Sequence, residues 1–489
     1  MILMRVVELF AGVGGFRLGF ERCKASKQEN SFRVIWANQW EPSSKKQHAA
    51  EIYAHHWNME NSEENPFIYT NDEGDILSNQ DIKLVNSSEI PDHDILCGGF
   101  PCQDYSVART ISGEMGIEGE KGKLWSEIHR IIAEKENKPK VIFLENVPRI
   151  LNSPAKFRGL NFSVIVKDLL DLGYDVEWRV INAAEYGMPQ KRRRTFIIGY
   201  NKSLGAKLPF ISSAKTRDDM TDWLFNNSDN KSGEGIFSRS FPSSGKLPEK
   251  KLPFPYPMSY AWNEKKSPFL NTGYSWKDED GKSWLWSTKS NPEFNGDYNT
   301  IRDIMVHEHD SDYEIKDKEN FRKYRYIKGE QKEFRIRKID SNLAREIITE
   351  DGSNMWDIYQ KCTKSYDSKL WEKYYDDFLE CKEKGLAYNY AAGAMSFPDS
   401  LDKPSRTIVT AEVGKSVSRM RHVIEYKEGN FRRLMPIELE RLNTFPDNWT
   451  NLDGVSDSRR GFLMGNALVI GIVEEIANSI FDLMETRGI

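Results

Sequence analysis

The stretch Glu8-Leu9-Phe10-Ala11-Gly12-Val13-Gly14-Gly15-Phe16 decides the fold of the N-terminal part of this chain. It completes an apolar run, Arg5 to Phe10, that predicts a buried strand, and it leads into a helical pattern that starts at Phe16. Glycines in such a turn permit unusual backbone angles and the close approach of a ligand, and the helix start offers unpaired N–H groups. A tight turn in any α/β protein explains the same residues equally well. Arg17 holds the third glycine position of the dinucleotide pattern GxGxxG, which weakens a phosphate-cradling interpretation and leaves a nucleoside-type ligand open.

Short apolar segments alternate with amphipathic helical patterns through the first 200 residues. This alternation predicts an α/β fold with a mostly parallel, doubly wound sheet that carries helices on both faces. The expected strands are Arg5–Phe10, Val34–Ala37, Asp94–Cys97, Val141–Leu144, Val176–Ile181 and Thr195–Ile198, and the expected helices include Leu124–Ala133 and Phe162–Leu172.

The composition changes after about Leu204, where residues 226–246 are rich in Ser, Asn and Gly and predict loops. An aromatic region follows, with a helical pattern over Met355–Lys384, and the chain ends in a pattern that predicts a helix over Ile470–Thr486. We therefore expect a first domain over residues 1–200, a second, smaller domain over 201–430, and a segment over 431–489 that returns to the first domain.

The composition excludes several classes of protein. The 489 residues carry a net charge of −5, so a generally polycationic coat is absent and any nucleic-acid surface must be local. No apolar run approaches the ~18 residues that a membrane span needs, and the N-terminus lacks the pattern of an export signal. Five cysteines without CxxC spacing favour neither disulfides nor zinc, the eight histidines show no metal-ligand spacing, and a cytoplasmic location is expected.

A cysteine follows the expected strand Asp94–Cys97, in the motif Gly98-Gly99-Phe100-Pro101-Cys102-Gln103. Open α/β sheets hold their ligands at the carboxyl ends of the strands, so Cys102 is a candidate nucleophile that would act as a thiolate. The glycine-rich stretch Ser106 to Lys123 has the composition of a lid. A small buried hydrophobe is the alternative for any lone cysteine, and it suits Cys97 on the strand itself.

Charged motifs mark two further strand boundaries. Glu145-Asn146-Val147 follows the expected strand Val141–Leu144, where a carboxylic acid can protonate or hydrogen-bond a substrate, or else cap a helix or pair with an arginine. Four consecutive cations, Lys191 to Arg194, precede the expected strand Thr195–Ile198. They form either an anion clamp or a solvated turn.

Taken in order, these motifs resemble the DNA (cytosine-5) methyltransferase family. The resemblance is carried by FAGVGGFRLGF, the GFPCQ loop, ENV, QKRRR, and the C-terminal RRLMPIELERLNTFPDNW with GNAL, over residues 1–200 and about 430–489. The family implies a Rossmann-like methyltransferase domain. It implies Cys102 as the nucleophile that attacks cytosine C6, Glu145 as the group that contacts and protonates N3, and Arg192 and Arg194 as the arginines that orient the base and anchor the catalytic loop.

The same resemblance implies S-adenosylmethionine as the cofactor. The glycine-rich loop would hold it, Glu41 would bind the ribose hydroxyls, and the C-terminal motif would close the pocket, although Ala467-Leu468 replaces the more usual Ser-Val there. The implied cofactor residues are Phe10, Gly12, Gly14, Gly15, Trp40, Glu41, Asp75, Ile76, Pro101, Leu124 and Asn466.

Residues 201–430 occupy the place of the family's target-recognition region. Between Ser405 and Arg433 seven Lys or Arg face three acids, a local charge of +4 that suits phosphate contacts. The expected DNA-contacting residues are Gln103, Ser106, Arg406, Thr407, Arg419 and Arg421. The segment Pro404 to Thr407 resembles that of methylases for GATC-type sites.

The expected partner is double-stranded DNA, with a base flipped out of the stack to reach the cysteine. We also expect a monomer that does not bind a membrane, and a cognate restriction endonuclease that acts on the same site. Two alternatives remain: an RNA (tRNA) cytosine-5 methyltransferase on the same scaffold, whose variable region is typically shorter, and a catalytically silent DNA-binding relative, against which the intact set of Cys102, Glu145, Arg192 and Arg194 counts.

Overall fold

The structure is a computed structural model of the chain. It describes residues 3–23, 32–42, 44–100, 123–154, 157–207, 216–225, 235–255, 266–325, 328, 336–365, 370, 373–384, 387–389, 395–418 and 420–487.

The chain divides into two compact units. The first, called the sheet unit here, comprises Met1–Asn299, Glu440–Val455 and Ala467–Ile489, and the second unit comprises Thr300–Leu439 and Ser456–Asn466. The division differs from the expected boundary at residue 200, because strands from the 201–299 region join the main sheet. The chain comes back to the sheet unit after Leu439, leaves it once more, and ends in it.

One sheet organises the sheet unit, with the strand order β12-β14-β13-β8-β10-β7-β6-β1-β2-β5-β4-β3. Its strands are β1 Met4–Leu9, β2 Phe32–Asn38, β3 Glu60–Asn61, β4 Ile68–Thr70, β5 Ile76–Ser78, β6 Ile95–Gly99, β7 Val141–Asn146, β8 Tyr174–Asn182, β10 Arg193–Asn201, β12 Leu252–Pro253, β13 Thr272–Lys277 and β14 Ser283–Thr288. In the described part of the sheet unit, three short strands lie outside this sheet: β9 Gln190–Lys191, β11 Ser243–Gly245 and β15 Ser290–Pro292.

The sheet is mixed, so the expectation of a mostly parallel sheet is correct only for its centre. β1 pairs in parallel with β2 and β6, β2 with β5, and β6 with β7. The pairs from β7 through β10, β8, β13 and β14 to β12 are antiparallel, and so are β5–β4 and β4–β3. An antiparallel neighbour needs no crossover helix, which allows the hairpin β13–β14 to extend the sheet beyond the first 200 residues.

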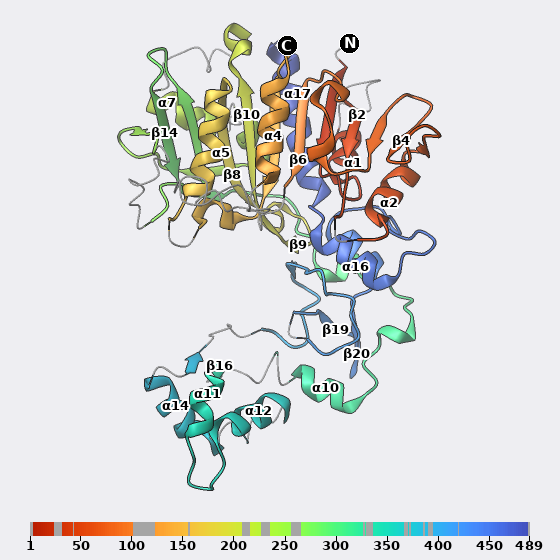
Figure 1. The fold of residues 1–489 in the computed structure, drawn as a ribbon, viewed down its shortest axis with the longest axis vertical. Coiled ribbons are helices and arrows are strands. Elements are labelled where there is room, and N and C mark those ends of the chain that lie inside the picture. The colour runs from red at the N-terminus through yellow and green to blue at the C-terminus, as the bar shows by residue number, and fades with distance from the viewer. Residues whose placement is uncertain are drawn as a thin grey trace. The chain divides into compact units, whose positions relative to one another are not determined.

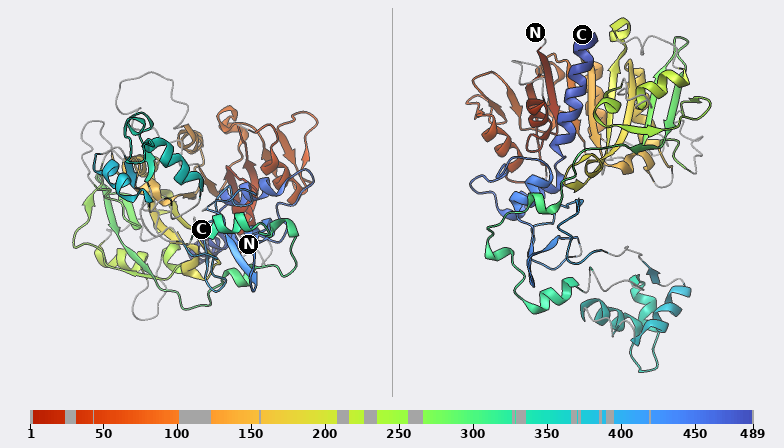
Figure 2. Two further views of the ribbon diagram at one scale, coloured as in Figure 1. Left: turned by 90° about the horizontal axis from the view of Figure 1, so that it is seen from below. Right: turned by 180° about the vertical axis from the view of Figure 1, so that it is seen from behind.

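Helices cover both faces of the sheet, as the sequence pattern predicted (Figures 1 and 2). Successive residues of a buried strand point to opposite faces: in β7, Val141 and Phe143 belong to one apolar cluster, whereas Ile142 and Leu144 belong to another. The first cluster takes in α1 Gly15–Arg22, α2 His48–His56, α7 Arg217–Leu224, α8 Ile236–Ser240 and α17 Ile470–Arg487, and the second takes in α4 Lys123–Glu134 and α5 Leu160–Asp171.

The second unit consists of short elements around a small core. Its helices are α9 Ile301–Ile304, α10 Lys318–Arg325, α11 Ser341–Glu346, α12 Met355–Ser365, α14 Tyr375–Glu383 and α16 Asp457–Asn466, with α15 Pro436–Leu442 at the unit boundary; its strands are β16 Ile336–Ile339, β17 Ala387–Asn389, β18 Ser405–Arg406, β19 Val423–Lys427 and β20 Asn430–Arg433. The helical pattern expected over Met355–Lys384 corresponds to α12 and α14, which pack together through Ile358, Cys362 and Phe378.

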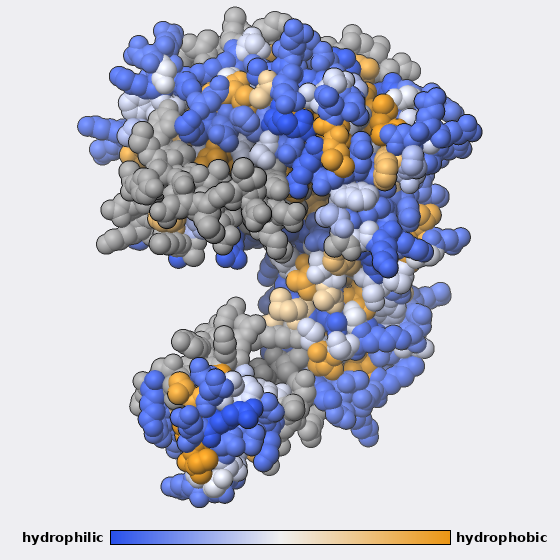
Figure 3. All heavy atoms as spheres, in the orientation of Figure 1, coloured by the Kyte–Doolittle hydropathy of each residue, from blue (hydrophilic) through white to orange (hydrophobic). Residues whose placement is uncertain are grey.

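Hydrophilic residues dominate the face of the sheet unit that Figure 3 shows, and apolar residues form only small patches there. Within the described residues, no helix is long and apolar enough to cross a membrane.

Candidate active site

Several of the expected site residues lie at or directly after the carboxyl ends of the parallel strands. β1, β2, β5, β6 and β7 are parallel, so their carboxyl ends lie at the same edge. The glycine loop follows β1, Trp40 and Glu41 follow β2, and the GFPCQ motif follows β6. This is the edge at which open α/β sheets bind ligands.

The glycine loop needs its glycines for two separate reasons. Phe10, Gly12 and Gly14 have φ values of 58°, 58° and 85°, in the left-handed region that costs side-chain-bearing residues energy. A Cβ added at Gly14 would lie 2.2 Å from Trp57 Cη2, whereas one added at Gly12 would meet no heavy atom within 4 Å. Gly14 is therefore set by packing against the protein, and Gly12 faces open space.

A buried ion pair supports this loop from below. Arg17, at the position where the dinucleotide pattern has glycine, donates to Asp75 Oδ2 over 2.7 Å and lies above the ring of Trp57. Arg33 donates to the other carboxylate oxygen of Asp75 over 2.8 Å, and Asn71 donates to Oδ2 over 3.3 Å. Asp75 is fully buried, so its side chain ties the loop helix to the edge of β5.

Glu8 adds a buried carboxyl group beneath the start of α1. Its oxygens accept hydrogen bonds from Phe16 N over 3.2 Å and from the Tyr53 hydroxyl over 3.3 Å. Burial raises the pKa of Glu8 to about 8, although the nearby positive charge of Arg17 opposes the rise. Cys97, one strand away on β6, is also buried, and burial raises the pKa of its thiol well above the ordinary value. Cys97 is thus part of the core, as expected.

Three of the expected cofactor residues pack against one apolar cluster. Phe10, Ile76 and Leu124 are each partly buried against the same cluster, which also contains Phe100. Trp40 and Glu41 are half-buried just past β2. The glycine loop and the Trp40–Glu41 segment thus follow the carboxyl ends of β1 and β2, whereas Ile76 is the first residue of β5 and lies beside Trp36 within β2.

Glu145 and Arg194 form an ion pair at the same edge. Arg194 Nε lies 2.6 Å from Glu145 Oε1, and both side chains keep some exposure, at 17% and 13%. The pairing of β10 with β7 sets this contact, since Phe196 lies opposite Glu145. Arg192 is buried, and burial together with the charge of Arg194 lowers the pKa of its guanidinium well below the ordinary value, against the opposing charge of Glu145.

The end of β6 is fixed next to this ion pair. Gly99 lies opposite Glu145 in the parallel register, and a Cβ at Gly99 would come within 3.2 Å of Glu145 Oε2. Asn146 Nδ2 donates to the carbonyl of Phe100 over 2.8 Å. The chain is thus held beside Glu145 up to the residue before Pro101. Pro101, Cys102, Gln103, Ser106 and, further along, Arg419 lie outside the described residues.

In the second unit, two of the expected DNA-contacting arginines, Arg406 and Arg421, are bonded within the protein. Arg421 is buried, and its guanidinium donates to the Ala411 carbonyl over 2.8 Å and to Ser416 Oγ over 2.9 Å. Arg406 Nε donates to Asp399 Oδ1 over 3.2 Å. Both geometries favour a role in shaping the 399–421 segment. Thr407 is half-buried, and Asn466, expected at the cofactor, is exposed at the end of α16.

Two residues at the sheet edge were missed by the sequence reasoning. Gln39 Oε1 accepts from Gly12 N over 2.7 Å and so joins the end of β2 to the glycine loop. Asn146 was quoted only as a neighbour of Glu145. Both residues come directly after or at the end of a buried strand, and a polar side chain at that position was the available signal.

Comparison with known proteins identifies the family. The profile described as C-5 cytosine-specific DNA methylase matches residues 4–482. Type II methyltransferase M.Sau3AI of Staphylococcus aureus is 35% identical over 482 residues, which cover 98% of this chain and 95% of that protein. Type II methyltransferase M.HhaI of Haemophilus parahaemolyticus is 37% identical over 201 residues, which cover 41% of this chain and 50% of that protein.

A solved structure of the methyltransferase EhMeth of Entamoeba histolytica covers 99% of each chain, with a TM-score of 0.50 at 14% identity, and so shares the fold. The chain belongs to the C-5 cytosine-specific DNA methylase family. It is a DNA (cytosine-5) methyltransferase, which confirms the resemblance and the activity expected from the sequence.

Proposed function

We propose that this enzyme uses S-adenosylmethionine to methylate a flipped-out cytosine within a short, specific duplex site. The observation that carries the proposal is the Glu145–Arg194 ion pair, which lies beside the strand end that leads to Cys102. A carboxyl group, a guanidinium and a cysteine at one sheet edge are the groups that cytosine C5 chemistry requires.

The residues around the glycine loop fit this cofactor. S-adenosylmethionine supplies the methyl group from its sulfonium. The open space at Gly12 admits a ligand against the main chain, and Phe10, directly after β1, offers a partly buried apolar side chain for the adenine. Glu41 binds the ribose hydroxyls, while Asp75 acts indirectly by holding Arg17.

Covalent catalysis makes C5 of cytosine reactive. The thiolate of Cys102 adds to C6, and Glu145 hydrogen-bonds and protonates N3, so that the C4–C5–C6 unit becomes enamine-like. Arg194 holds the Glu145 carboxyl in place through its Nε. After C5 has gained the methyl group, a base removes the C5 proton and the pair of electrons expels Cys102, which regenerates the thiolate, while N3 returns its proton to Glu145.

The test is methyl transfer from tritiated S-adenosylmethionine to unmethylated plasmid DNA and, in parallel, to total tRNA. Bisulfite sequencing of the plasmid then locates the modified bases. We expect label at one short repeated DNA motif, and GATC is the first sequence to inspect because of the Pro404 to Thr407 segment. Label in tRNA alone would replace the proposal by the RNA alternative.

The nucleophile has its own test. We expect Cys102→Ser to abolish turnover while S-adenosylmethionine still binds in calorimetry, and we expect duplex DNA with 5-fluorocytosine at the target to form a covalent adduct on Cys102. The fluorine cannot leave as a proton does, so the adduct persists and appears by intact mass. An active Cys102→Ser variant or the absence of any adduct would refute the assignment.

The proposal includes a biological setting. The relatives named above are type II methyltransferases, which supports a role in protecting cytoplasmic DNA from a cognate restriction endonuclease. Because each strand is methylated separately, a monomer suffices, and sedimentation of the enzyme on a duplex that carries one site would measure this.

A further inference from the structure

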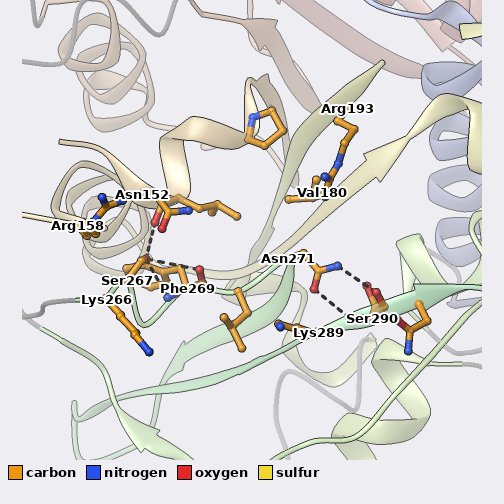
Figure 4. A pocket seen from close by; sticks show the side chains of 14 residues that line it. Asn152, Arg158, Val180, Arg193, Lys266, Ser267, Phe269, Asn271, Lys289 and Ser290 are labelled. Atoms are coloured by element: carbon orange, nitrogen blue, oxygen red, sulfur yellow. Dashed lines mark hydrogen bonds between the residues drawn. The ribbon is translucent and has the colours of Figure 1, made fainter. Parts of the chain in front are cut away.

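A cavity at the edge of the sheet unit is not used by the chemistry above. Its volume is about 720 Å³. It is bounded by the short 3-10 helix η5, Pro148–Asn152, by Arg193 at the start of β10, and by residues 266–271 and 289–291 on either side of the hairpin β13–β14 (Figure 4).

The cavity is cationic. Arg158, Arg193, Lys266 and Lys289 line it, all four are exposed, and the lining contains no Asp or Glu. Within the described residues, no carboxylate forms a salt bridge with Arg193, Lys266 or Lys289. Four positive charges around one hollow attract an anion with several charged oxygens.

The segments that carry the two lysines are fixed in place. Ser267 Oγ donates to the Leu151 carbonyl on η5. Asn271 and Ser290 exchange two hydrogen bonds, from Asn271 Nδ2 to the Ser290 carbonyl over 3.0 Å and from Ser290 N to Asn271 Oδ1 over 2.9 Å (Figure 4). Phe269 is buried beneath them. The lysines therefore stand on a preformed rim, which reduces the cost of ordering them around a ligand.

The cavity lies at the same edge of the sheet as the proposed catalytic residues, on the other face. Arg193 lies between Arg192 and Arg194 in the chain, and η5 begins three residues after Glu145. Alternation along β10 places Arg193 on the face of Ile197 and Arg194 on the face of Phe196. A duplex bound along this edge would bring backbone phosphates to the cavity.

We propose that the cavity binds backbone phosphates of the DNA duplex next to the target cytosine. This inference rests on the proposed function. The phosphate contacts would be independent of sequence and would hold the duplex at the sheet edge while the base leaves the stack.

The test compares the salt dependence of DNA binding by wild-type enzyme, Lys266→Gln/Lys289→Gln and the control Lys282→Gln. Lys282 is also exposed and precedes β14, whereas Lys289 follows it, so the two lysines stand about 20 Å apart on one hairpin. Fluorescence anisotropy of a labelled duplex over a NaCl series gives the slope of log K against log salt. We expect the double variant to lose about 1.8 from the slope, since each phosphate contact contributes about 0.9, and the control to match the wild type.

Equal slopes for the double variant and the wild type would overturn the inference. A second probe separates DNA phosphates from a free anion: pyrophosphate, without DNA, in a thermal unfolding assay. If pyrophosphate stabilises the wild type but not the double variant while the DNA slopes coincide, the cavity serves a free polyphosphate, and the DNA inference fails. Wild-type methyl transfer to the plasmid is measured alongside, so that failure of the proposed function itself is recognised separately.

Discussion

Replacing Gly14 by alanine tests the idea that packing against Trp57 shapes the cofactor loop. The added methyl group would lie 2.2 Å from Trp57 Cη2 and 2.3 Å from Cζ3, and the residue keeps a φ of 85°. Both the contact and the backbone angle must be relieved, so the loop has to move or α2 has to shift.

The cost can be worked from two contributions. The left-handed backbone conformation costs about 1–2 kcal/mol for a residue with a Cβ, and overpacking a filled site costs about 1–3 kcal/mol. We therefore expect Gly14→Ala to lower the free energy of unfolding by about 2–5 kcal/mol. Gly12→Ala and Gly74→Ala carry φ values of 58° and 80° with no heavy atom within 4 Å of the new Cβ, so they should show only the backbone cost.

Urea unfolding and calorimetric titration with S-adenosylmethionine measure stability and binding together. Gly74 lies outside the loop, so Gly74→Ala should leave the affinity unchanged, whereas Gly12→Ala places a methyl group on the ligand side and should weaken binding beyond its effect on stability. Trp57→Leu should rescue Gly14→Ala in a double-mutant cycle by about 1–3 kcal/mol.

Equal stabilities for Gly14→Ala and Gly12→Ala, or additive effects of Gly14→Ala and Trp57→Leu, would refute the packing argument. Unchanged affinity in Gly12→Ala, at intact stability, would show that the cofactor does not lie against this loop.

Three more predictions concern charged groups. The folded-state pKa of Glu8 is about 8, against 4.5 for the ordinary group, so its contribution to stability is present below pH 4.5 and is lost as pH rises toward 8. In urea unfolding, the wild type should lose up to about 5 kcal/mol over that range relative to Glu8→Gln. Parallel pH curves for the two proteins would contradict this. Arg194→Ala should lower kcat about 100-fold at unchanged S-adenosylmethionine affinity, since Glu145 loses its anchor, and a normal kcat in single-turnover assays would exclude that role. Arg432→Met should destabilise the second unit by about 3–5 kcal/mol, because Glu438 stays buried without its 2.6 Å partner. Hydrogen exchange of that unit measures the change, and exchange rates equal to those of the wild type would contradict this prediction.

Local pattern was sufficient for the elements that are apolar along their whole length. The expected strands Val141–Leu144 and Thr195–Ile198 lie inside β7 and β10, which extend further because Glu145 and Asn146 remain in register with β10 although their side chains are polar. Strand direction was not predictable in the same way. The sequence pattern of an antiparallel neighbour such as β10 is the same as that of a parallel strand, since both kinds of strand are apolar along their length when they are buried on two faces.

The site shows the same division between local and distant information. The motif order pointed to the residues at the sheet edge, but the partners of Asp75 depend on contacts with Arg17 and Arg33, which are 58 and 42 residues away. The internal bonding of Arg421 depends on how the 411–418 loop returns to it. A charge count over 405–433 treats such arginines as cations that can contact DNA, because the sequence does not show that their guanidinium groups already donate hydrogen bonds within the protein.

The last helix of the chain closes the core around the first. Val473, Ile476 and Ile480 of α17 share a cluster with Phe16 and Phe20 of α1, and Gly19 lies so close that a Cβ there would meet Val473 at 2.5 Å. During synthesis, this face of the nascent sheet therefore stays uncovered until α17 has left the ribosome. A product that stops before Ile470 lacks this cover and exposes apolar surface to chaperones and proteases. Only chains that include α17 would then support the cofactor loop from this side.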